Sequence, residues 1–372
     1  MGKSYYSLGL MSGTSMDGVD ASIIQSNGEE KYKGIIDKYY EYPKAIYKDL
    51  TAIRDKIKSL KDLNNFSNEI KNIEKDITLF HGKVANQILK KTKKKVDFIG
   101  FHGQTIFHDG KQKISRQLGD GKLLSFLTKK TIVYNFRKND LKNGGQGAPL
   151  TPIFHKLLKE KLKIKQASFV NIGGIINTTH FTQKDKISGS DLGPGMCLID
   201  KWMRLKLKKR YDKNGDIAKS GKINDLILKK MMNNFYKKRA KILKKNFYTI
   251  SYDVQDFDLS LVKNLSTKDG AATLIQFAIN MIHNSFELSH NKHEKIILTG
   301  GGRKNKFFVK KLKEKNDRIK LIDEYGIDGD FIESQAFAYL AIRSYLKLPI
   351  SFPETTGVKK ACTGGIVQKT KL

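Results

Sequence analysis

Apolar residues along the chain follow two patterns, namely short continuous runs and longer stretches with helical spacing. The short runs end at glycine-rich turns, which is typical of strands buried in a sheet. Between residues 62 and 90 the apolar side chains recur at spacings of three and four, which predicts an amphipathic helix. The repeated order of strand, glycine-rich loop and helix predicts an α/β fold. We expect strands at residues 5–10, 19–25, 96–101, 132–136, 168–172 and 295–298, and helices at 62–90, 149–161, 271–288 and 333–346.

The first glycine-rich loop, at residues 9–20, lies between two expected strands, so we expect a hairpin rather than the strand-to-helix turn of a P-loop. Glycine lets backbone N–H groups approach an anion closely, and serine and threonine hydroxyls add donors. A carboxylate at Asp17 tolerates a neighbouring phosphate only with Mg²⁺ present. The loop predicts phosphate binding, and an ordinary Gly-Ser turn is the alternative. The candidate nucleotide-binding residues are Gly13, Thr14, Ser15, Met16, Asp17, Gly18, Val19 and Asp20.

Two later loops have a similar character. Gly173 and Gly174 follow the strand at 168–172 and precede another apolar run, and three glycines follow the strand at 295–298. Each loop alone is weak support for a ligand. The chain has neither the Gly-x-x-x-x-Gly-Lys-Ser/Thr motif nor the Rossmann glycine motif. Together the three loops resemble the nucleotide clamp of the two-domain actin/hexokinase-like fold, and the late loop adds Gly300, Gly301, Gly302 and Asn305 as candidates.

Composition narrows the class of protein. A chain of 372 residues with 39% apolar residues suits two domains with substantial cores. The net charge of +33 comes from lysines spread along the whole chain, so we expect no nucleic-acid partner, and the excess favours approach of anionic ligands. No apolar stretch reaches the roughly 18 residues that cross a bilayer, and we identify no signal peptide. Cys197 and Cys362 form no disulfide framework, so a reducing cytoplasm is expected.

Six sequence strings stand in order along the chain, at residues 11–20 (MSGTSMDGVD), 102–105 (HGQT), 136–150 with GGQGAPL at its end, 171–177 (NIGGIIN), 191–195 (DLGPG) and 300–305 (GGGRKN). These strings, in this order, are similar to those of the anhydro-N-acetylmuramic acid kinase family. The resemblance implies two actin/hexokinase-like domains with ATP in a cleft between them, which we expect at residues 1–150 plus about 333–372 and at 151–332. It also implies a homodimer. The implied reaction opens the 1,6-anhydro ring of anhydro-N-acetylmuramic acid with water and phosphorylates O6 with ATP and Mg²⁺, in recycling of murein.

The same resemblance assigns roles to individual residues. Asp191 matches the family's catalytic base, which would take a proton from the attacking water, and general-base help of this kind contributes roughly 10²- to 10⁴-fold. Attack opposite the departing oxygen is similar to an inverting glycoside hydrolysis. The guanidinium of Arg137 suits the lactyl carboxylate of the sugar. The candidate sugar-binding residues are His102, Gln104, Arg137, Gln146 and Glu333.

Each of these residues also has a structural interpretation. Asp191 precedes a Gly-Pro-Gly turn and could be a turn or N-cap aspartate. His102 could be a structural hydrogen-bonding residue, Arg137 could form an ion pair between strands, and Glu333 could be an N-terminal helix charge. Two other functions remain open at this point. One is a different sugar kinase of the same fold, and the other is a non-catalytic, nucleotide-switched module.

The chain departs from the family pattern at three places. Met196 stands where most members have Asn, so one amide at the turn after Asp191 is lost. Residues 240–242 (AKI) replace a Pro-Lys-Ser string, and Asn135 stands where Asp or Thr is common. These departures affect the expected lid contacts and the fine specificity for the sugar.

Overall fold

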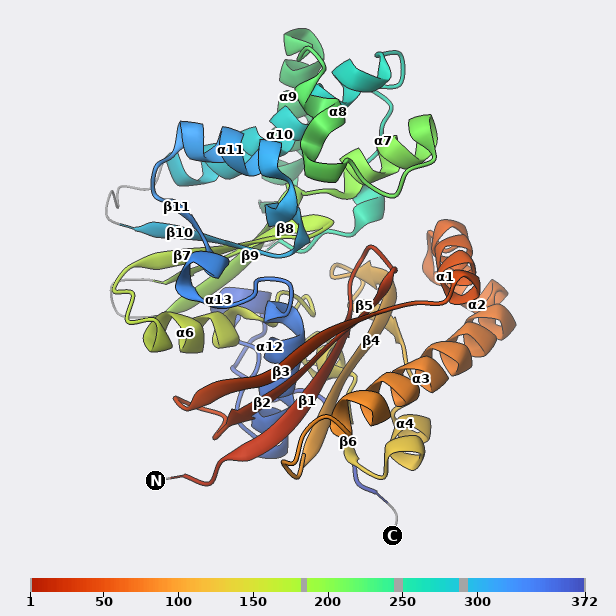
Figure 1. Cartoon of the computed structure of the whole chain (residues 1–372). Helices are drawn as coiled ribbons and strands as arrows, with labels where there is room; N and C mark the ends of the chain where they lie inside the picture. The colour runs from red at the N-terminus through yellow and green to blue at the C-terminus, as the bar shows by residue number, and fades with distance from the viewer. Residues whose placement is uncertain (1, 182–185, 244–249, 288–293, 371–372) are drawn as a thin grey trace. The chain divides into compact units, whose positions relative to one another are not determined.

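The computed structural model describes residues 2–181, 186–243, 250–287 and 294–370. The chain separates into two compact units. Unit 1 comprises residues 1–165 and 330–372, and unit 2 comprises residues 166–329. The last helix of the chain therefore returns to the unit that holds the N-terminus (Figure 1).

The sheet of unit 1 combines an antiparallel meander with parallel strands. β1 pairs antiparallel with β2, β2 pairs antiparallel with β3, and β1 and β4 are parallel. β6 lies parallel to β4, and β12 pairs antiparallel with β6 at the edge of the sheet. β5 pairs with the C-terminal half of β4. The strands are β1 (Tyr5–Ser12), β2 (Gly18–Ser26), β3 (Tyr32–Glu41), β4 (Phe98–Asp109), β5 (Ile114–Leu118), β6 (Thr131–Tyr134) and β12 (Ile366–Gln368).

Successive side chains of β1 point to opposite faces of the sheet and lie in two separate apolar cores. Leu8 and Leu10 belong to the core that contains apolar residues of α3, whereas Met11 packs in the core that contains Phe337 of α12. On the α12 side the backbones touch, because a Cβ on Gly9 would lie 1.8 Å from the carbonyl oxygen of Ser334. The helices of unit 1 are α1 (Lys44–Lys56), α2 (Leu60–Asn65), α3 (Ser67–Leu89), α4 (Gly121–Thr128), α5 (Phe136–Lys142), α6 (Pro152–Lys161), α12 (Ile332–Tyr345) and α13 (Pro353–Thr356).

Unit 2 repeats the same sheet plan. Its strands are ordered β11-β10-β7-β8-β9, with β7, β8 and β9 antiparallel and β7, β10 and β11 parallel. The strands are β7 (Ala167–Ile172), β8 (Ile175–Phe181), β9 (Ile187–Pro194), β10 (Lys295–Thr299) and β11 (Ile319–Leu321). The helices are α7 (Cys197–Leu207), α8 (Asp216–Lys219), α9 (Asp225–Leu243), α10 (Thr267–Glu287) and α11 (Lys306–Lys315), with 3₁₀ turns at Lys213–Gly215, Val254–Asp256, Gly301–Lys304 and Ile322–Tyr325.

The two sheets share one strand order, β3-β2-β1-β4-β6 in unit 1 and β9-β8-β7-β10-β11 in unit 2. In each, a three-stranded meander is followed by parallel strands joined through helices, which is an α/β arrangement. The expected α/β class is confirmed, and the two units are of similar construction, as expected.

Several predicted boundaries need correction. The helix expected over 62–90 is two helices, because Phe66 leaves helical geometry between α2 and α3. The strand expected at 96–101 continues to Asp109, so residues 102–105 lie within β4 rather than in a loop. The strand expected at 132–136 ends at Tyr134, since Asn135 takes a left-handed conformation and Phe136 begins α5. The helix expected to 288 is α10, and Leu288 lies outside the described residues.

The boundary near residue 150 also differs. Helix α6, expected in the second domain, belongs to unit 1. The physical reason is its packing, since the ring of Phe154 contacts those of Tyr32 and Tyr339. The boundary falls at 165/166 on one side and at 329/330 on the other.

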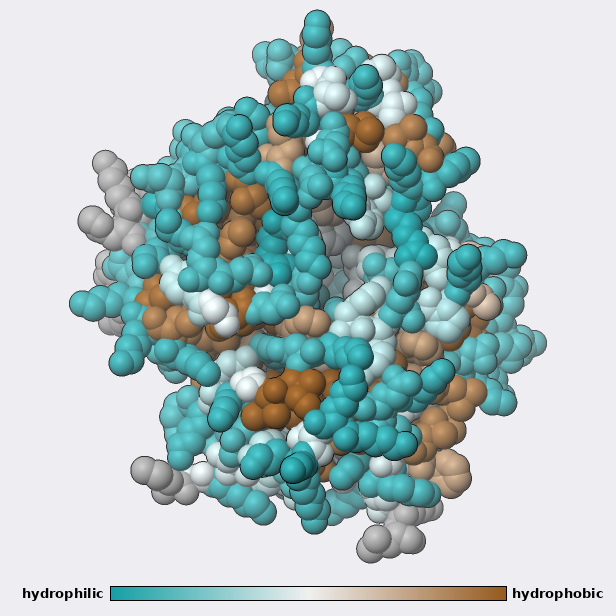
Figure 2. Space-filling view, viewed as in Figure 1, coloured by the Kyte–Doolittle hydropathy of each residue, from teal (hydrophilic) through white to brown (hydrophobic). Residues whose placement is uncertain are grey.

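Polar side chains cover most of the face seen in Figure 2, with separate smaller apolar areas. This agrees with the even spread of lysine along the sequence. Among the described residues, no helix combines the length and the apolar character that spanning a membrane requires.

Candidate active site

The first glycine-rich loop is the short connection between β1 and β2. Met16 takes a left-handed φ of 57° and its side chain is buried, so the loop is anchored in the core of unit 1. The N–H of Met16 donates to the carbonyl of Gly13 at 3.2 Å, and the hydroxyl of Ser15 donates to the carboxylate of Asp17. Thr14 and Ser15 are exposed at the tip. The loop therefore has a fixed base and presents hydroxyl groups to solvent.

Among the described residues, a Cβ on Gly13 would meet only Ser15 Oγ, at 3.9 Å, so the surface over this glycine is open. Gly18 is different, since a Cβ there would lie 2.4 Å from the carbonyl oxygen of Tyr40. Gly13 thus leaves room for a ligand, whereas Gly18 is required by the packing of β2 on β3. A phosphate fits at Gly13, Thr14 and Ser15, and Asp17 beside them is a suitable oxygen ligand for a hard cation.

A buried polar cluster that sequence reasoning missed lies under this loop. Ser12 Oγ is 2.8 Å from Tyr42 Oη and 3.2 Å from His81 Nε2, and His81 Nδ1 lies 2.8 Å from the carbonyl oxygen of Ile77. Burial lowers the pKa of His81 to about 4, so the ring is neutral at neutral pH. The neutral ring donates from Nδ1 and accepts from Ser12 at Nε2. The cluster fixes the end of β1 from which the loop starts.

His102 occupies a β-bulge in β4. Leu10 pairs with Phe101 and Met11 with Gly103, so His102 is the extra residue, and Gly103 supplies the left-handed φ of 74°. Both ring nitrogens of His102 have protein partners, because Nδ1 donates to the carbonyl of Gly103 at 2.8 Å and Nε2 accepts from Arg137 Nη2 at 3.0 Å. Burial, and then the charge of Arg137, hold the pKa of His102 well below its usual range.

Arg137 lies in α5 rather than between strands. Its Nη1 donates to the carbonyl of Gly147 at 2.7 Å. Burial raises the pKa of Glu333, at the start of α12, and the charge of Arg137 opposes that rise, so the two groups are close enough to interact. Arg137, His102, Glu333 and the Gly147 carbonyl thus form one cluster, in which His102 serves to orient Arg137.

Asp140 holds the loop that carries Gly147. Its carboxylate is fully buried and accepts from the N–H of Gly147 at 2.6 Å and from the hydroxyl of Thr356. A Cβ on Gly145 would lie 2.1 Å from Asp140 Oδ1, which explains the glycine there. Gln146, in the same loop, is buried and donates its N–H to Thr356 O at 2.8 Å. Asp140 lies in one of the family strings, but the sequence analysis gave it no role. Its contact with Thr356 could not be predicted from the sequence.

Gln104 is fully buried below the first glycine-rich loop. Its Nε2 donates to the carbonyl of Gly13 at 3.0 Å. From this position Gln104 can support the first glycine-rich loop at least as well as it can contact the sugar.

In unit 2, Asp191 sits in β9 beside another bulge. Ile176 pairs with Gly193 and Asn177 with Asp191, so Leu192 is the extra residue. The Asp191 side chain is 5% exposed, and its Oδ2 accepts from the N–H of Tyr252 at 2.8 Å. The Asp191 N–H donates to Ile250 O at 2.9 Å, so a backbone segment remote in sequence clamps this residue from two directions. Asp191 is not the N-cap of a helix, since α7 begins at Cys197.

Arg239 of α9 also supports Asp191. Its Nη1 donates to the carbonyls of Asp191 at 2.9 Å and Leu192 at 3.1 Å, which holds the bulge. Arg239 directly precedes residues 240–242, where the family's Pro-Lys-Ser string was sought. Sequence reasoning examined those three residues and missed the neighbouring arginine.

The turn after Asp191 packs against the second glycine-rich loop. The N–H groups of Gly195 and Met196 donate to the carbonyls of Gly174 and Gly173 at 2.8 and 2.9 Å. Two carbonyls of the glycine pair therefore face the start of α7. Met196, which replaces the family's Asn, is 9% exposed and lies in the apolar core of unit 2.

The third glycine-rich loop follows β10. Gly300 and Gly302 are required by close approach to β7, since a Cβ on either would lie 2.3 Å from Asn171 Oδ1 or Ile172 Cγ2, respectively. A Cβ on Gly301 would meet none of the described atoms within 4 Å. Asn305 caps α11 by accepting the Phe308 N–H at 3.0 Å. Of these four residues, only Gly301 presents an open surface.

Arg303, which sequence reasoning did not select, stiffens this loop. It binds Asp323 through Nε at 2.7 Å and Nη2 at 2.8 Å, and its Nη1 donates to Gly300 O at 3.2 Å. The arginine lowers the pKa of Asp323, chiefly through these hydrogen bonds. The bidentate pair fixes the loop in one conformation.

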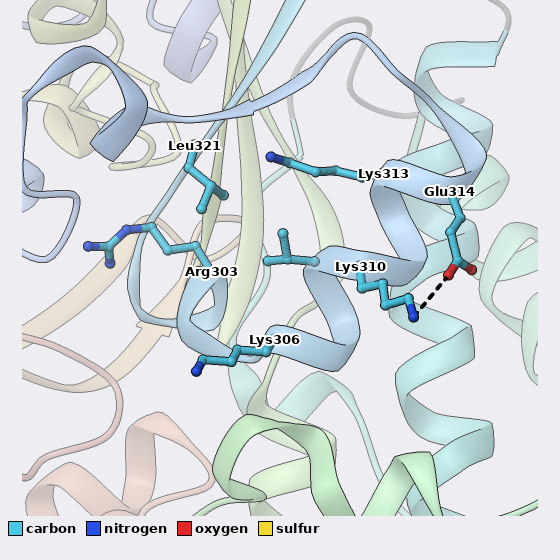
Figure 3. Close-up of a pocket in the computed structure, with 7 residues that line it drawn as sticks. Arg303, Lys306, Lys310, Lys313, Glu314 and Leu321 are labelled. Atoms are coloured by element: carbon cyan, nitrogen blue, oxygen red, sulfur yellow. Dashed lines mark ion pairs between the residues drawn. The ribbon is translucent and has the colours of Figure 1, made fainter.

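An open groove of about 580 Å³ lies beside α11 (Figure 3). Of the predicted site residues, none lines it. Two of its lysines form ion pairs, Lys310 with Glu314 at 4.0 Å and Lys313 with Glu324 at 2.8 Å. The groove shares only Arg303 with the loop described above. Its lining consists of Arg303, Lys306, Val309, Lys310, Lys313, Glu314 and Leu321.

The candidate residues thus form two sets. Unit 1 brings together His102, Arg137 and Glu333, with Gln104 under the first glycine-rich loop, and unit 2 places Asp191 and the other two glycine-rich loops in one sheet. Within the described part of the chain, no three His, Cys, Asp or Glu side chains gather as they would around a resident metal ion.

Comparison with known proteins identifies the family. The profile of the family described as anhydro-N-acetylmuramic acid kinase matches residues 5–370. A curated relative with that name, from Pelagibacter ubique, is 52% identical over 99% of this chain and 100% of its own length. Relatives of the same name from Zymomonas mobilis (36% identical, covering 96% and 98%) and Rhizobium etli (34%, covering 97% of each) also match. The chain therefore belongs to the anhydro-N-acetylmuramic acid kinase family, which is a family of enzymes.

Proposed function

We propose that this kinase uses ATP, with Mg²⁺, to phosphorylate O6 of 1,6-anhydro-N-acetylmuramic acid while water opens the anhydro ring. The products are N-acetylmuramate 6-phosphate and ADP. The family match supports the substrate, and it does not favour a different sugar kinase or a non-catalytic nucleotide-binding module. The structural observation that carries the proposal is the buried carboxylate of Asp191 at the β9 bulge, which accepts the Tyr252 N–H while the backbone of the same residue is held by Ile250.

In this proposal Asp191 is the general base. It takes a proton from water as the water oxygen bonds to C1, the C1–O6 bond breaks, and O6 bonds to the γ-phosphorus while ADP departs. The proton then passes from Asp191 to solvent. A base that is held by Tyr252, Ile250 and Arg239 needs little rearrangement to react, which favours catalysis.

The sugar-side set of unit 1 binds and orients the substrate. Arg137 pairs with the lactyl carboxylate, and His102 with the Gly147 carbonyl orients the guanidinium. Glu333 and Gln146 contribute further sugar contacts. Gly13, Thr14 and Ser15 contact the phosphates, Gly173, Gly174 and Gly301 line the nucleotide side in unit 2, and Asp17 is the residue that would hold Mg²⁺. The cation would supply charge neutralisation at the phosphates.

We also propose that the enzyme is a cytoplasmic homodimer that takes part in peptidoglycan recycling. Large exposed apolar side chains in unit 2 offer surface for self-association, with Leu226 83% exposed, Leu205 58% and Tyr211 57%.

The test of the proposed function is whether ATP consumption depends on the sugar. Purified protein with ATP and Mg²⁺ is expected to release ADP only when 1,6-anhydro-N-acetylmuramic acid is added, with one phosphorylated sugar formed per ADP. ADP release of equal rate without the sugar would contradict the proposal and favour a nucleotide-switched module.

A further inference from the structure

A row of four polar side chains crosses the sheet of unit 2 and ends at Asp191. Thr299 of β10 pairs with Asn171 of β7, Asn171 pairs with Asn177 of β8, and Asn177 pairs with Asp191 of β9. Residues paired directly across strands project from the same face of a sheet, with Cβ atoms about 4.5–5.5 Å apart in antiparallel pairs. Thr299 Oγ1 donates to Asn171 Oδ1 at 3.4 Å, so the row is joined at its far end.

Asn177 is the member of this row next to the proposed base. Its Oδ1 atom is buried and has no hydrogen-bond partner among the described residues. Buried acceptors of this kind are rare in native proteins, and at a functional site they indicate a group that binds there. A bulge directly beside the Asn177–Asp191 pair is a further sign of a built site, since bulges often adjust side-chain direction next to active sites.

Two neighbouring oxygen acceptors, the carboxylate of Asp191 and the amide oxygen of Asn177, select what can bind between them. A water molecule satisfies both, because it donates two hydrogen bonds in different directions. A divalent cation needs six or more oxygen ligands, and no cluster of three or more His, Cys, Asp or Glu side chains exists in the described part of the chain. The pair therefore suits a water molecule better than a resident metal ion.

We propose that Asn177 is a catalytic residue that holds the attacking water together with Asp191. This inference rests on the proposed function. Asn177 Oδ1 accepts one O–H of the water, and Asp191 accepts the other and removes that proton as the oxygen bonds to C1. The C1–O6 bond breaks, O6 takes the γ-phosphoryl group, and the proton on Asp191 passes to solvent. Since an amide does not take up a proton near neutral pH, it orients the water without competing with the base.

The proposed role also explains why residue 177 is an amide rather than a carboxylate. A second acid beside Asp191 would raise the pKa of one of the two carboxyl groups, because like charges this close are not both ionised easily. Among the described groups beside Asp191 are Arg239, which contacts its carbonyl, and Tyr252, whose pKa is raised by burial and lowered in part by Arg239. Asn177 adds an acceptor to this environment and no charge.

The experiment compares Asn177→Ala, Asn177→Asp and a matched control, Asn284→Ala, with the wild type. Asn284 lies in α10 of the same unit and bonds Tyr236 Oη at 3.3 Å. In Asn177→Ala we expect kcat to fall by roughly 10- to 100-fold, since the water loses its orientation, with KM for sugar and ATP within about twofold. In Asn177→Asp we expect the acidic limb of the pH profile of kcat/KM to move to higher pH.

Three results would overturn the inference. The first is Asn177→Ala with the same kcat as Asn284→Ala. The second is a kcat for Asn177→Ala that returns to the wild-type value at saturating Mg²⁺, which would make Asn177 a metal ligand. The third is a pH profile of Asn177→Ala in which the maximal kcat is unchanged and only the acidic limb is shifted. That result would mean that the Asn177 amide donates a hydrogen bond to Asp191 instead of binding the water. If the alanine variant fails to fold, the isosteric Asn177→Asp variant decides through its pH profile. A wild-type enzyme without sugar-dependent turnover would instead refute the proposed function itself.

Discussion

Replacing Asp191 with Asn is expected to abolish phosphorylation of the anhydro-sugar while ATP binding persists. The amide is isosteric with the carboxylate and can still accept the Tyr252 N–H at its oxygen, so the clamp on β9 is retained. What is lost is the ability to take a proton from water, and a general base contributes roughly 10²- to 10⁴-fold to the rate. The measurement is kcat from sugar-dependent ADP release, together with nucleotide affinity from calorimetric titration.

The matched control for Asp191→Asn is Asp258→Asn. Asp258 is an exposed carboxylate of the same unit that accepts the Ser260 N–H at 2.7 Å. Its conversion to an amide is expected to leave kcat and the thermal midpoint unchanged. Activity of the Asp191 variant within a few-fold of the wild type would refute the assignment of the base.

Replacing Arg137 with Lys is expected to raise KM for the anhydro-sugar by about 10- to 100-fold, because hydrogen bonds to charged groups contribute about 1.5–3 kcal/mol each. An ammonium group has no planar fork, so it would not bind the Gly147 carbonyl and His102 Nε2 while also pairing with a carboxylate in bidentate fashion. KM for ATP is expected to stay unchanged. Steady-state kinetics with each substrate varied in turn gives both values.

A second substrate separates a carboxylate contact from a general disturbance of unit 1. The anhydro-sugar that lacks the lactyl group, 1,6-anhydro-N-acetylglucosamine, has no carboxylate for Arg137 to bind. Arg137→Lys should therefore weaken binding of the muramic acid derivative much more than binding of this analogue, and Arg54→Lys, at an arginine paired with Asp55, should affect neither. An equal loss for both sugars would show that Arg137 supports the fold rather than the carboxylate.

The sequence was sufficient to predict the α/β class and the strands that precede the glycine-rich loops, because those strands are continuous apolar runs. Through the family strings it also selected Asp191, Arg137 and His102 as candidates, and their roles stay predictions. It did not predict that residues 102–105 continue β4, since a bulge at His102 depends on Gly103 adopting a left-handed conformation against β5. Nor did it distinguish Gly301, which is open, from Gly300 and Gly302, which pack on β7.

Supporting residues were the least predictable part of the site. Arg239 and Tyr252 contact Asp191 from segments about 50 and 60 residues away, and Thr356 reaches Asp140 across more than half of the chain. Contacts of this kind depend on tertiary packing, which leaves no local periodicity. The row from Thr299 to Asp191 has the same origin, because it exists only through the register of four strands.

In the proposed reaction, one catalytic cycle both hydrolyses the anhydro bond and transfers phosphate to O6. Carrying out the reaction in ¹⁸O-labelled water and analysing the product by mass spectrometry tests it directly. We expect one labelled oxygen at C1 of the N-acetylmuramate 6-phosphate and none in its phosphate group. Label in the phosphate, or a phosphorylated product that still contains the intact anhydro ring, would contradict it.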